Sequence, residues 1–324
     1  MPVPRLLEYS TIRVSSGFSG ASTYIRSIYE PMMHISDVML PDPSRPGLAD
    51  RYEHRLAGRR FDAKFGTELR GRAAASAVDD PLPDGDLYHA VGFNGYGNTG
   101  ANYVYALHDI HSYDSSAAGD LFPCDLGIII DGINVGGGSD CAGNAVFRFP
   151  ANDICTVEWE FAGVNGGGLV ATAPPETTPA VTESVGDTVL GNNATISFTP
   201  AGGDAITTLC VRDMTIDLRN TVLLRPCIAQ QFGFTKPVLP ERNVTFSGVI
   251  EAPLLATADF DSLVTNRTII TAAITVGDVA KSIFTFAFKF TLNQMPDLTN
   301  IDGMLGYAFE GKMHPTGLLT ITVT

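Results

Sequence analysis

Charged residues are scarce in this sequence of 324 residues. Asp, Glu, Lys and Arg together make up 17% of the chain, whereas about a quarter is usual for a soluble domain. Hydrophobic residues make up 44%, which is enough for one large core or two ordinary ones, and the length favours about two domains. Because few charges are available to cover the surface, we expect the protein to bury much of that surface against partners.

Basic residues are scarcer than acidic ones, and the formal net charge is −14. An acidic protein has no general affinity for nucleic acid, because binding to phosphate requires clustered Lys and Arg. Eight of the 21 basic residues nevertheless lie between residues 45 and 72. Two interpretations of this cluster remain open: a solvated loop and strand, or a basic arm that docks on an acidic neighbouring subunit. The residues predicted to form the arm are Arg51, Arg55, Arg59 and Arg60.

Cysteine is rare as well. The chain has five cysteines, an odd number, and none of them forms a C-x-x-C motif. Neither a zinc site nor a disulfide framework is therefore indicated. We expect free, buried thiols in a reducing compartment.

Long apolar segments are also missing. The N-terminal stretch MPVPRLLEYSTIRVSSG lacks the apolar region of a signal peptide. No run of about 18 apolar residues occurs that would span a membrane. We therefore predict no signal peptide and no membrane contact.

Helical periodicity is weak, and alternation with a period of two dominates. In Ser282–Leu292, the side chains of Phe284, Phe286, Phe288 and Phe290 occupy every second position. A strand places these phenylalanines on one face, whereas a helix would scatter them around its axis. Further strands are expected at 61–71, 124–130, 145–149, 155–163, 211–219, 243–250, 268–276 and 317–324. The sequence therefore predicts an all-β protein, an antiparallel β-sandwich.

Two short helices complete the predicted elements. Residues 86–91 are expected to form a helix capped by Asp86, and residues 259–264 a second one. The phenylalanine stripe is predicted to line the core of the sandwich. A stacking platform for single-stranded nucleic acid would require interleaved basic residues, and only Lys289 is present.

Glycine and proline concentrate between residues 165 and 205. This composition is incompatible with continuous regular structure, although a hairpin is expected around Gly191-Asn192-Asn193. We predict a first β domain over residues 1–165 with an extended arm at 30–60, a linker with a hairpin over 166–205, and a second β domain over 206–324. A weak internal repeat supports this division, because the strand and helix expected at 60–91 are followed by a similar pair at 241–264.

Motifs that carry catalytic chemistry are weak. Residues 95–100 match G-x-G-x-x-G, but no βαβ unit surrounds them, so a flexible loop is favoured over a dinucleotide site. Residues 136–138 are three glycines without a following lysine, which favours a turn over a phosphate-binding loop. His108 and His111 with Asp114 do not complete a metal site. No G-x-S-x-G motif exposes a serine, so we predict no enzyme activity, no cofactor and no metal.

The second half contains an ordered series of features. A strand ending in Asn precedes a segment that runs from an arginine through a strand to an acidic residue. A dense aromatic strand, a proline loop, an Asp-Gly turn and a Thr-rich final strand follow. The segments are 211–220, 241–251, 284–292, Met295-Pro296, Asp302-Gly303, 307–309 and 317–324, with family-like pieces at 68–71 and 87–93 in the first half. This order resembles the tail tube (major tail) proteins of long-tailed, siphovirus-type bacteriophages.

The resemblance implies a subunit with a tail-tube fold, whose strands join those of neighbouring copies into a closed barrel. Stacked rings of this barrel would form the phage tail tube, the conduit for DNA ejection. Three chains would form a ring if both halves are tube folds, and six chains otherwise. The implied partners are the chain itself, the tape measure, terminator and distal tail proteins, and passing double-stranded DNA that is not bound specifically. The implied location is the virion tail, after synthesis in the bacterial host cytoplasm.

Two other classes of function remain open. Another virion component, such as a tail terminator, baseplate or decoration protein, would form closed single rings without filaments. A carbohydrate-binding β-sandwich would need exposed aromatic residues on loops, for which the candidates are Tyr96, Tyr103, Tyr105 and Tyr113.

Overall fold

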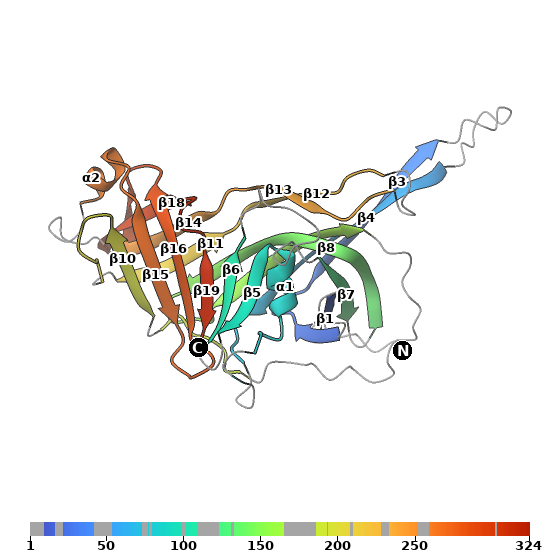
Figure 1. Ribbon diagram of the computed structural model, residues 1–324, viewed down its shortest axis with the longest axis horizontal. Helices are drawn as coiled ribbons and strands as arrows, with labels where there is room; N and C mark the ends of the chain where they lie inside the picture. The colour runs from blue at the N-terminus through green and yellow to red at the C-terminus, as the bar shows by residue number, and fades with distance from the viewer. Residues whose placement is uncertain are drawn as a thin grey trace.

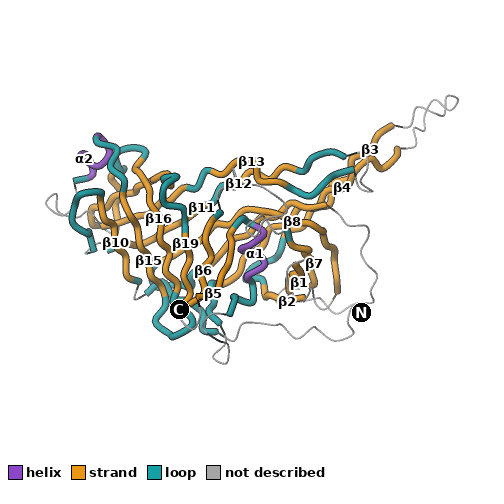
Figure 2. The backbone as a smooth tube through the Cα atoms, in the orientation of Figure 1, coloured by secondary structure: helices purple, strands orange, loops and turns teal. Residues whose placement is uncertain are grey.

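The protein is almost entirely built of antiparallel β-strands. The computed structural model describes residues 10–16, 22–41, 54–72, 77, 80–98, 102–108, 123–130, 133–164, 186–192, 194–207, 210–227, 233–251, 259–301 and 303–324. Within these ranges the chain forms nineteen strands and two short helices (Figures 1 and 2). The predicted all-β class is therefore confirmed.

The strands and helices follow one another in two successive series. The first series is β1 (Ser10–Ser16), β2 (Ser22–Arg26), β3 (Met32–Pro41), β4 (His54–Glu68), α1 (Gly85–Ala90), β5 (Phe93–Asn98), β6 (Asn102–Leu107), β7 (Cys124–Ile130), β8 (Ile133–Pro150) and β9 (Thr156–Val164). The second series is β10 (Thr195–Pro200), β11 (Val211–Asp217), β12 (Asn220–Leu223), β13 (Val238–Arg242), β14 (Thr245–Glu251), α2 (Phe260–Thr265), β15 (Ile270–Val276), β16 (Phe284–Leu292), β17 (Asp297–Ile301), β18 (Met304–Met313) and β19 (Thr320–Val323).

The strands form two layers that pack face to face. The long layer has the strand order β3-β4-β9-β8-β11-β14-β18-β17. The short layer has the order β10-β15-β16-β19-β6-β5. The end of β16 also pairs with β18 and so joins the layers at one corner, while β2, β1 and β7 extend from the first part of β8.

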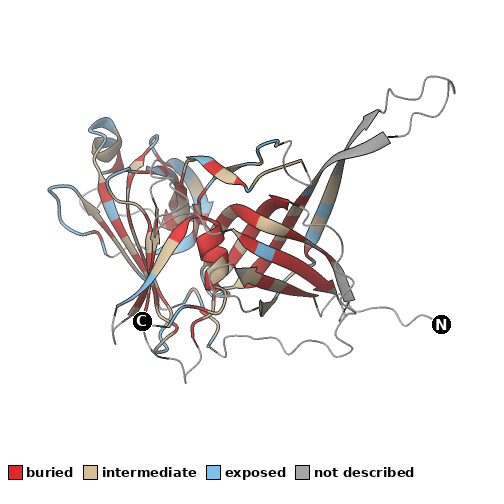
Figure 3. Cartoon of the chain, turned by 45° about the vertical axis from the view of Figure 1, so that its right-hand side comes forward, coloured by how far each residue is buried: buried red, intermediate tan, exposed pale blue. Residues whose placement is uncertain are grey.

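The alternation in the sequence becomes the core between the layers. Every second residue of β16 is buried, and Phe284, Phe286, Phe288 and Phe290 are at most 3% exposed. Phe286 contacts the ring of Phe147 from the long layer, with ring centroids 5.5 Å apart. Full burial of one such side chain stabilises a fold by about 1.5–3 kcal/mol. The buried residues form one core cluster with members in both halves of the chain, and Figure 3 shows them on the strands of the body.

The two halves share both layers. β8 of the first half pairs with β11 of the second in the long layer. β6 of the first half pairs with β19 of the second in the short layer. Residues 166–185 and 193 of the predicted linker lie outside the described residues, and the division into two domains stays a prediction.

Several local predictions were correct. The strands expected at 124–130, 155–163, 211–219 and 268–276 correspond to β7, β9, β11 and β15 with small shifts at their ends. α2 begins as expected, because the carboxylate of Asp259 accepts a hydrogen bond of 3.1 Å from the backbone N–H of Ser262. Among the described residues, no helix has the length and apolar character needed to cross a membrane.

Other local predictions were wrong. α1 begins at Gly85, so Asp86 lies in its first turn rather than at its cap. Residues 95–97 lie in β5, not in a flexible loop, and residues 136–138 lie in β8, not in a turn. Glycine allows close packing in β8, because a Cβ atom at Gly138 would collide with the ring of Phe61.

The hairpin expected around Gly191-Asn192 does not form. Thr188 and Leu190 make isolated bridges with Arg70 and Ile154 of the first half. The following strand, β10, pairs with β15 instead. Long-range partners therefore take the backbone groups that a local hairpin would have paired.

Candidate assembly interface

The long layer ends in two strands that each pair on one side alone. Within the described residues, β3 pairs only with β4 and β17 pairs only with β18. An edge strand presents a row of backbone N–H and C=O groups that a further strand can pair. In Figure 1 the label of β3 lies towards the right-hand end of the molecule, and that of β18, the partner of β17, lies in its left half.

The order of strands in the long layer repeats once. In the first half a hairpin, β3–β4, is followed along the chain by α1 and then by a second hairpin, β8–β9. In the second half the hairpin pair β11–β14 is followed by α2 and then by β17–β18. The second strands of the hairpins pair in both cases, β4 with β9 and β14 with β18. The strand order of the layer is therefore β3-β4-β9-β8 in the first repeat and β11-β14-β18-β17 in the second.

The junction between these two repeats is an antiparallel pairing of β8 with β11. Phe147 lies opposite Ile216, and Phe149 lies opposite Met214. All four side chains are buried, at 5% exposure or less. The two repeats are therefore connected both by strand pairing and by a continuous apolar face, as neighbouring strands are within a single sheet.

Two polar side chains of the second half form hydrogen bonds across the same junction. The guanidinium of Arg242 donates to the carbonyl oxygens of His108 (2.7 Å) and Val91 (3.1 Å) and to Oδ1 of Asn220 (2.7 Å). The side-chain amide of Asn220 donates to the carbonyls of Val91 and Gly143, each at 2.9 Å. Both residues come from the second half and bind backbone of the first.

The outward face of the long layer is polar and mainly acidic. Its acidic residues are Asp62, Glu68, Glu158, Glu160, Asp213, Asp217, Glu251, Asp297 and Glu310, and its basic residues are Arg60, Lys64, Arg148 and Lys312. Arg148 pairs with Glu158 at 2.9 Å, and Arg60 pairs with Asp62 at 2.7 Å. The face runs across both halves without interruption and keeps an excess of negative charge.

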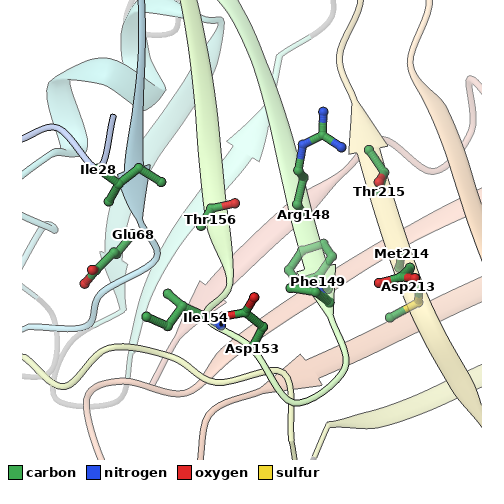
Figure 4. Close-up of a pocket in the computed structure, with 11 residues that line it drawn as sticks. Ile28, Glu68, Arg148, Phe149, Asp153, Ile154, Thr156, Asp213, Met214 and Thr215 are labelled. Carbon is green, nitrogen blue, oxygen red and sulfur yellow. Dashed lines mark hydrogen bonds between the residues drawn. The ribbon is translucent and has the colours of Figure 1, made fainter. Parts of the chain in front are cut away.

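A pocket of about 430 Å³ opens on this face beside the junction (Figure 4). Its floor is formed by four neighbouring strands of the long layer, which contribute Glu68, Thr156, Arg148 and Thr215. Ile28, Phe149, Pro150, Asp153, Ile154, Asp213 and Met214 complete the lining. The lining offers carboxylates and one guanidinium but no cysteine, histidine or lysine.

The predicted basic arm lies on the hairpin β3–β4 at the free edge, which projects from the body of the molecule (Figure 1). Arg51 lies outside the described residues. Arg55, Arg59 and Arg60 lie on β4 opposite Leu40, Asp37 and Ser36 of β3. Arg59 is half-buried and Arg60 is exposed. Their role in contacts between subunits stays a prediction.

The predicted phenylalanine stripe contributes no exposed surface, because Phe284, Phe286, Phe288 and Phe290 all face the core. On the opposite face of β16, Thr285, Lys289 and Thr291 are half-buried. Two of the aromatic residues considered for carbohydrate binding are also core residues, since Tyr105 is 0% and Tyr103 is 8% exposed. Tyr96 is exposed, and Tyr113 lies outside the described residues.

The cysteines are free, as expected, but they are not all buried. Cys124, Cys141 and Cys155 are buried, Cys227 is half-buried and Cys210 is exposed. Burial raises the pKa of the Cys155 thiol to about 12, so this thiol stays protonated and unreactive at neutral pH. Among the residues that the structure describes, no three His, Cys, Asp or Glu side chains are grouped to hold a metal ion. His111 and Asp114 lie outside these residues.

Two features of the long layer were not predicted from the sequence. Arg242 and Asn220 were singled out as parts of a family-like pattern, but nothing in the sequence showed that they bind the first half. The apolar residues of the β17–β18 hairpin, Leu298 and Leu305, were not singled out. Their position on either side of the Asp302-Gly303 turn was the available signal.

No protein-family model matches the chain, and no curated protein is significantly similar to it. The resemblance to phage tail tube proteins therefore stays a prediction, and functional inference depends on the architecture.

Proposed function

We propose that this protein is a structural virion subunit that joins copies of itself edge to edge into closed rings, and that the rings stack into a phage tail tube. The observation that carries the proposal is the repeated strand order of the long layer. Two repeats already join inside one chain through β8 and β11, and the outer ends of the layer, β3 and β17, remain unpaired among the described residues. A sheet with an open edge at each end is suited to polymerisation.

The contact between copies would be heterologous, because it joins two different edges. Heterologous contacts generate closed rings when their rotation divides a full turn, and open filaments when it does not. Closure of the ring pairs every edge. Since each chain contributes two repeats, three chains would supply six repeats to a ring. Six chains are the alternative if only one half of each chain takes part.

The acidic outward face suits a channel for DNA. Carboxylates repel phosphate, so double-stranded DNA would pass along such a surface without specific binding. The excess of Asp and Glu extends over both halves of the long layer. The role also implies contacts with tape measure, terminator and distal tail proteins in the virion, after synthesis in the bacterial cytoplasm.

Electron microscopy of the purified protein tests this proposal. We expect negatively stained samples at high concentration to contain rings and stacked tubes, and sedimentation velocity to show species much larger than a 34.5 kDa monomer. Closed rings that never stack would favour a terminator or baseplate component instead. A protein that stays monomeric at high concentration, also after addition of a tail-initiator complex, would overturn the proposal.

The basic arm offers a separate test of stacking. If the arm docks on the acidic face of the next ring, reversing the charge of Arg55, Arg59 and Arg60 to Glu should prevent the formation of tubes. Tube length measured in micrographs is the readout. Tubes of unchanged length would show that the arm does not hold rings together.

A further inference from the structure

The hairpin β17–β18 leaves large apolar side chains uncovered. Leu298 is 66% exposed and Leu305 is 58% exposed. Leu298 lies opposite Tyr307 in the strand register, and Leu305 lies two residues before Tyr307, so all three share one face of the sheet. The same face carries the buried Phe309. It is therefore the core-facing side of the long layer, which continues past the part that the short layer covers.

This arrangement is unusual for the edge of a sheet in a monomer. Edge strands are commonly protected by charges or proline on the strand, by a bulge, or by a covering helix or loop. β17 runs Asp-Leu-Thr-Asn-Ile, so Asp297 at its start is the only charge. An exposed apolar strip beside a row of unpaired backbone groups marks a surface that binds another chain.

The junction inside the chain shows what covers such a surface. In the repeated strand order, β17 occupies the position of β8, and β3 occupies the position of β11. The strands of the long layer alternate in direction from β3 to β17, so β3 of another copy would meet β17 in an antiparallel orientation, as β11 meets β8. The core-facing residues of β3 are apolar as well, since Met33 and Ile35 pack against the hydrophobic core and are half-buried.

Charge complementarity supports the same partner. The acidic residues nearest the β17 edge on the outward face are Asp297, Glu251 and Glu310. On the same outward face, the hairpin at the β3 edge carries Arg60 and Lys64 beside Asp62. The short layer offers no comparable template, because its order β10-β15-β16-β19-β6-β5 does not repeat.

We infer that β17 of one copy pairs in antiparallel fashion with β3 of a second copy, and that Leu298 and Leu305 are buried in this contact. The inference rests on the proposed function, since it names the surface through which the ring closes. It extends the long layer from chain to chain with the same backbone pairing that joins β8 to β11.

Engineered disulfides test the pairing and its register. Exposed Cys210 and half-buried Cys227 are first replaced by Ser, which leaves only buried thiols. Thr299→Cys is then combined with Met32→Cys, His34→Cys or Ser36→Cys, because all four residues lie on the outward face of the layer. Matched controls combine Thr299→Cys with Met33→Cys or Ile35→Cys, whose side chains lie on the opposite face.

We expect mild oxidation of assembled protein to link one of the three outward combinations into a ladder of dimers, trimers and larger species on non-reducing gels. The ladder arises because each copy uses two different edges. A mixture of the two single-cysteine variants should stop at dimers. Rings that form normally without a cross-link in any outward combination, or with equal cross-linking in the controls, would overturn the pairing while leaving the proposed function intact.

A second pair of variants tests the apolar strip directly. Leu298→Lys with Leu305→Lys should raise the concentration needed for assembly by at least about tenfold, because two leucines lose their burial. Val279→Lys is the matched control, since Val279 is also an exposed apolar residue, at 44% exposure, but lies in the turn between β15 and β16. Circular dichroism confirms that each variant is folded. Assembly of the double variant at the wild-type concentration would refute the inference, whereas failure of the wild-type protein to assemble would refute the proposed function itself.

Discussion

Replacing Arg242 with Met should weaken the attachment of the second half to the first more than any neighbouring surface change. The guanidinium donates to two backbone carbonyls of the first half, those of His108 and Val91. Gly92 makes room for it, because a Cβ atom at Gly92 would collide with the guanidinium, and its φ of +96° also favours glycine. Methionine keeps the length of the side chain but none of these hydrogen bonds.

The magnitude follows from the number and kind of bonds. A hydrogen bond that involves a charged group contributes about 1.5–3 kcal/mol net. Two such bonds cross the junction, but Arg242 is half-buried, so we take the lower end and expect a loss of about 3 kcal/mol in the free energy of unfolding. The carbonyl of Val91 keeps a bond from Asn220, whereas the carbonyl of His108 loses this donor. Arg219→Met is the control, because Arg219 is 49% exposed and makes only surface ion pairs with Asp217 and Glu310.

Urea denaturation followed by tryptophan fluorescence measures the difference. The chain has one tryptophan, Trp159, which is fully buried in the first half, so its emission reports on the opening of the core there. The protein is kept dilute, since assembly itself stabilises the folded state. At a slope of about 3 kcal/mol per molar urea, the midpoint of the Arg242 variant should fall by about 1 M, and that of the Arg219 variant by less than about 0.2 M. Equal midpoints for the two variants would refute the idea that Arg242 locks the halves together.

Two further predictions concern titratable groups. Burial raises the pKa of the Asp84 carboxyl from 3.8 to about 7, so the folded protein binds this proton more tightly than the unfolded chain and loses stability as the pH rises from about 4 to about 7. Asp84→Asn should therefore raise the free energy of unfolding at pH 8 by on the order of 1–2 kcal/mol and leave it nearly unchanged at pH 4; an equal effect at both pH values would contradict this. The pKa of the exposed Cys210 thiol is raised, mainly by its hydrogen bond with Glu251. Glu251→Gln should therefore speed the reaction of Cys210 with a thiol reagent at pH 8. An unchanged rate would show that the carboxylate does not keep the thiol protonated.

The strands that could be predicted from the sequence are those whose burial follows from local alternation. Phe284–Phe290 and the final strand were correctly predicted because one face of each is uniformly buried. The short helix expected at 259–264 was correctly predicted, and Asp259 caps it through a hydrogen bond with a residue three positions away. The cap at Asp86 was wrong because two aspartates, Asp84 and Asp86, flank the start of α1 and only the tertiary fold decides between them.

The failed predictions share a dependence on distant partners. The glycines 136–138 resemble a turn in isolation, yet they lie in β8, where a Cβ atom would collide with Met33 at Gly136, with the Leu126 carbonyl at Gly137 and with Phe61 at Gly138. Thr188 and Leu190 resemble one arm of a hairpin, yet both bridge to the first half. The junction of β8 with β11 joins residues more than sixty positions apart, and no local pattern encodes such a pairing.

Backbone pairing and side chains have different roles in joining the two repeats of the long layer. An antiparallel edge contact satisfies N–H and C=O groups whatever the side chains are, so it explains how a strand order can repeat within one chain. It does not explain why β11, rather than another edge, follows β8. Arg242 and Asn220 supply that specificity inside the chain, because they bind carbonyls that belong only to the first half. If copies of the chain join edge to edge as we propose, the exposed Leu298 and Leu305 and the charges beside them are the groups available for the same purpose.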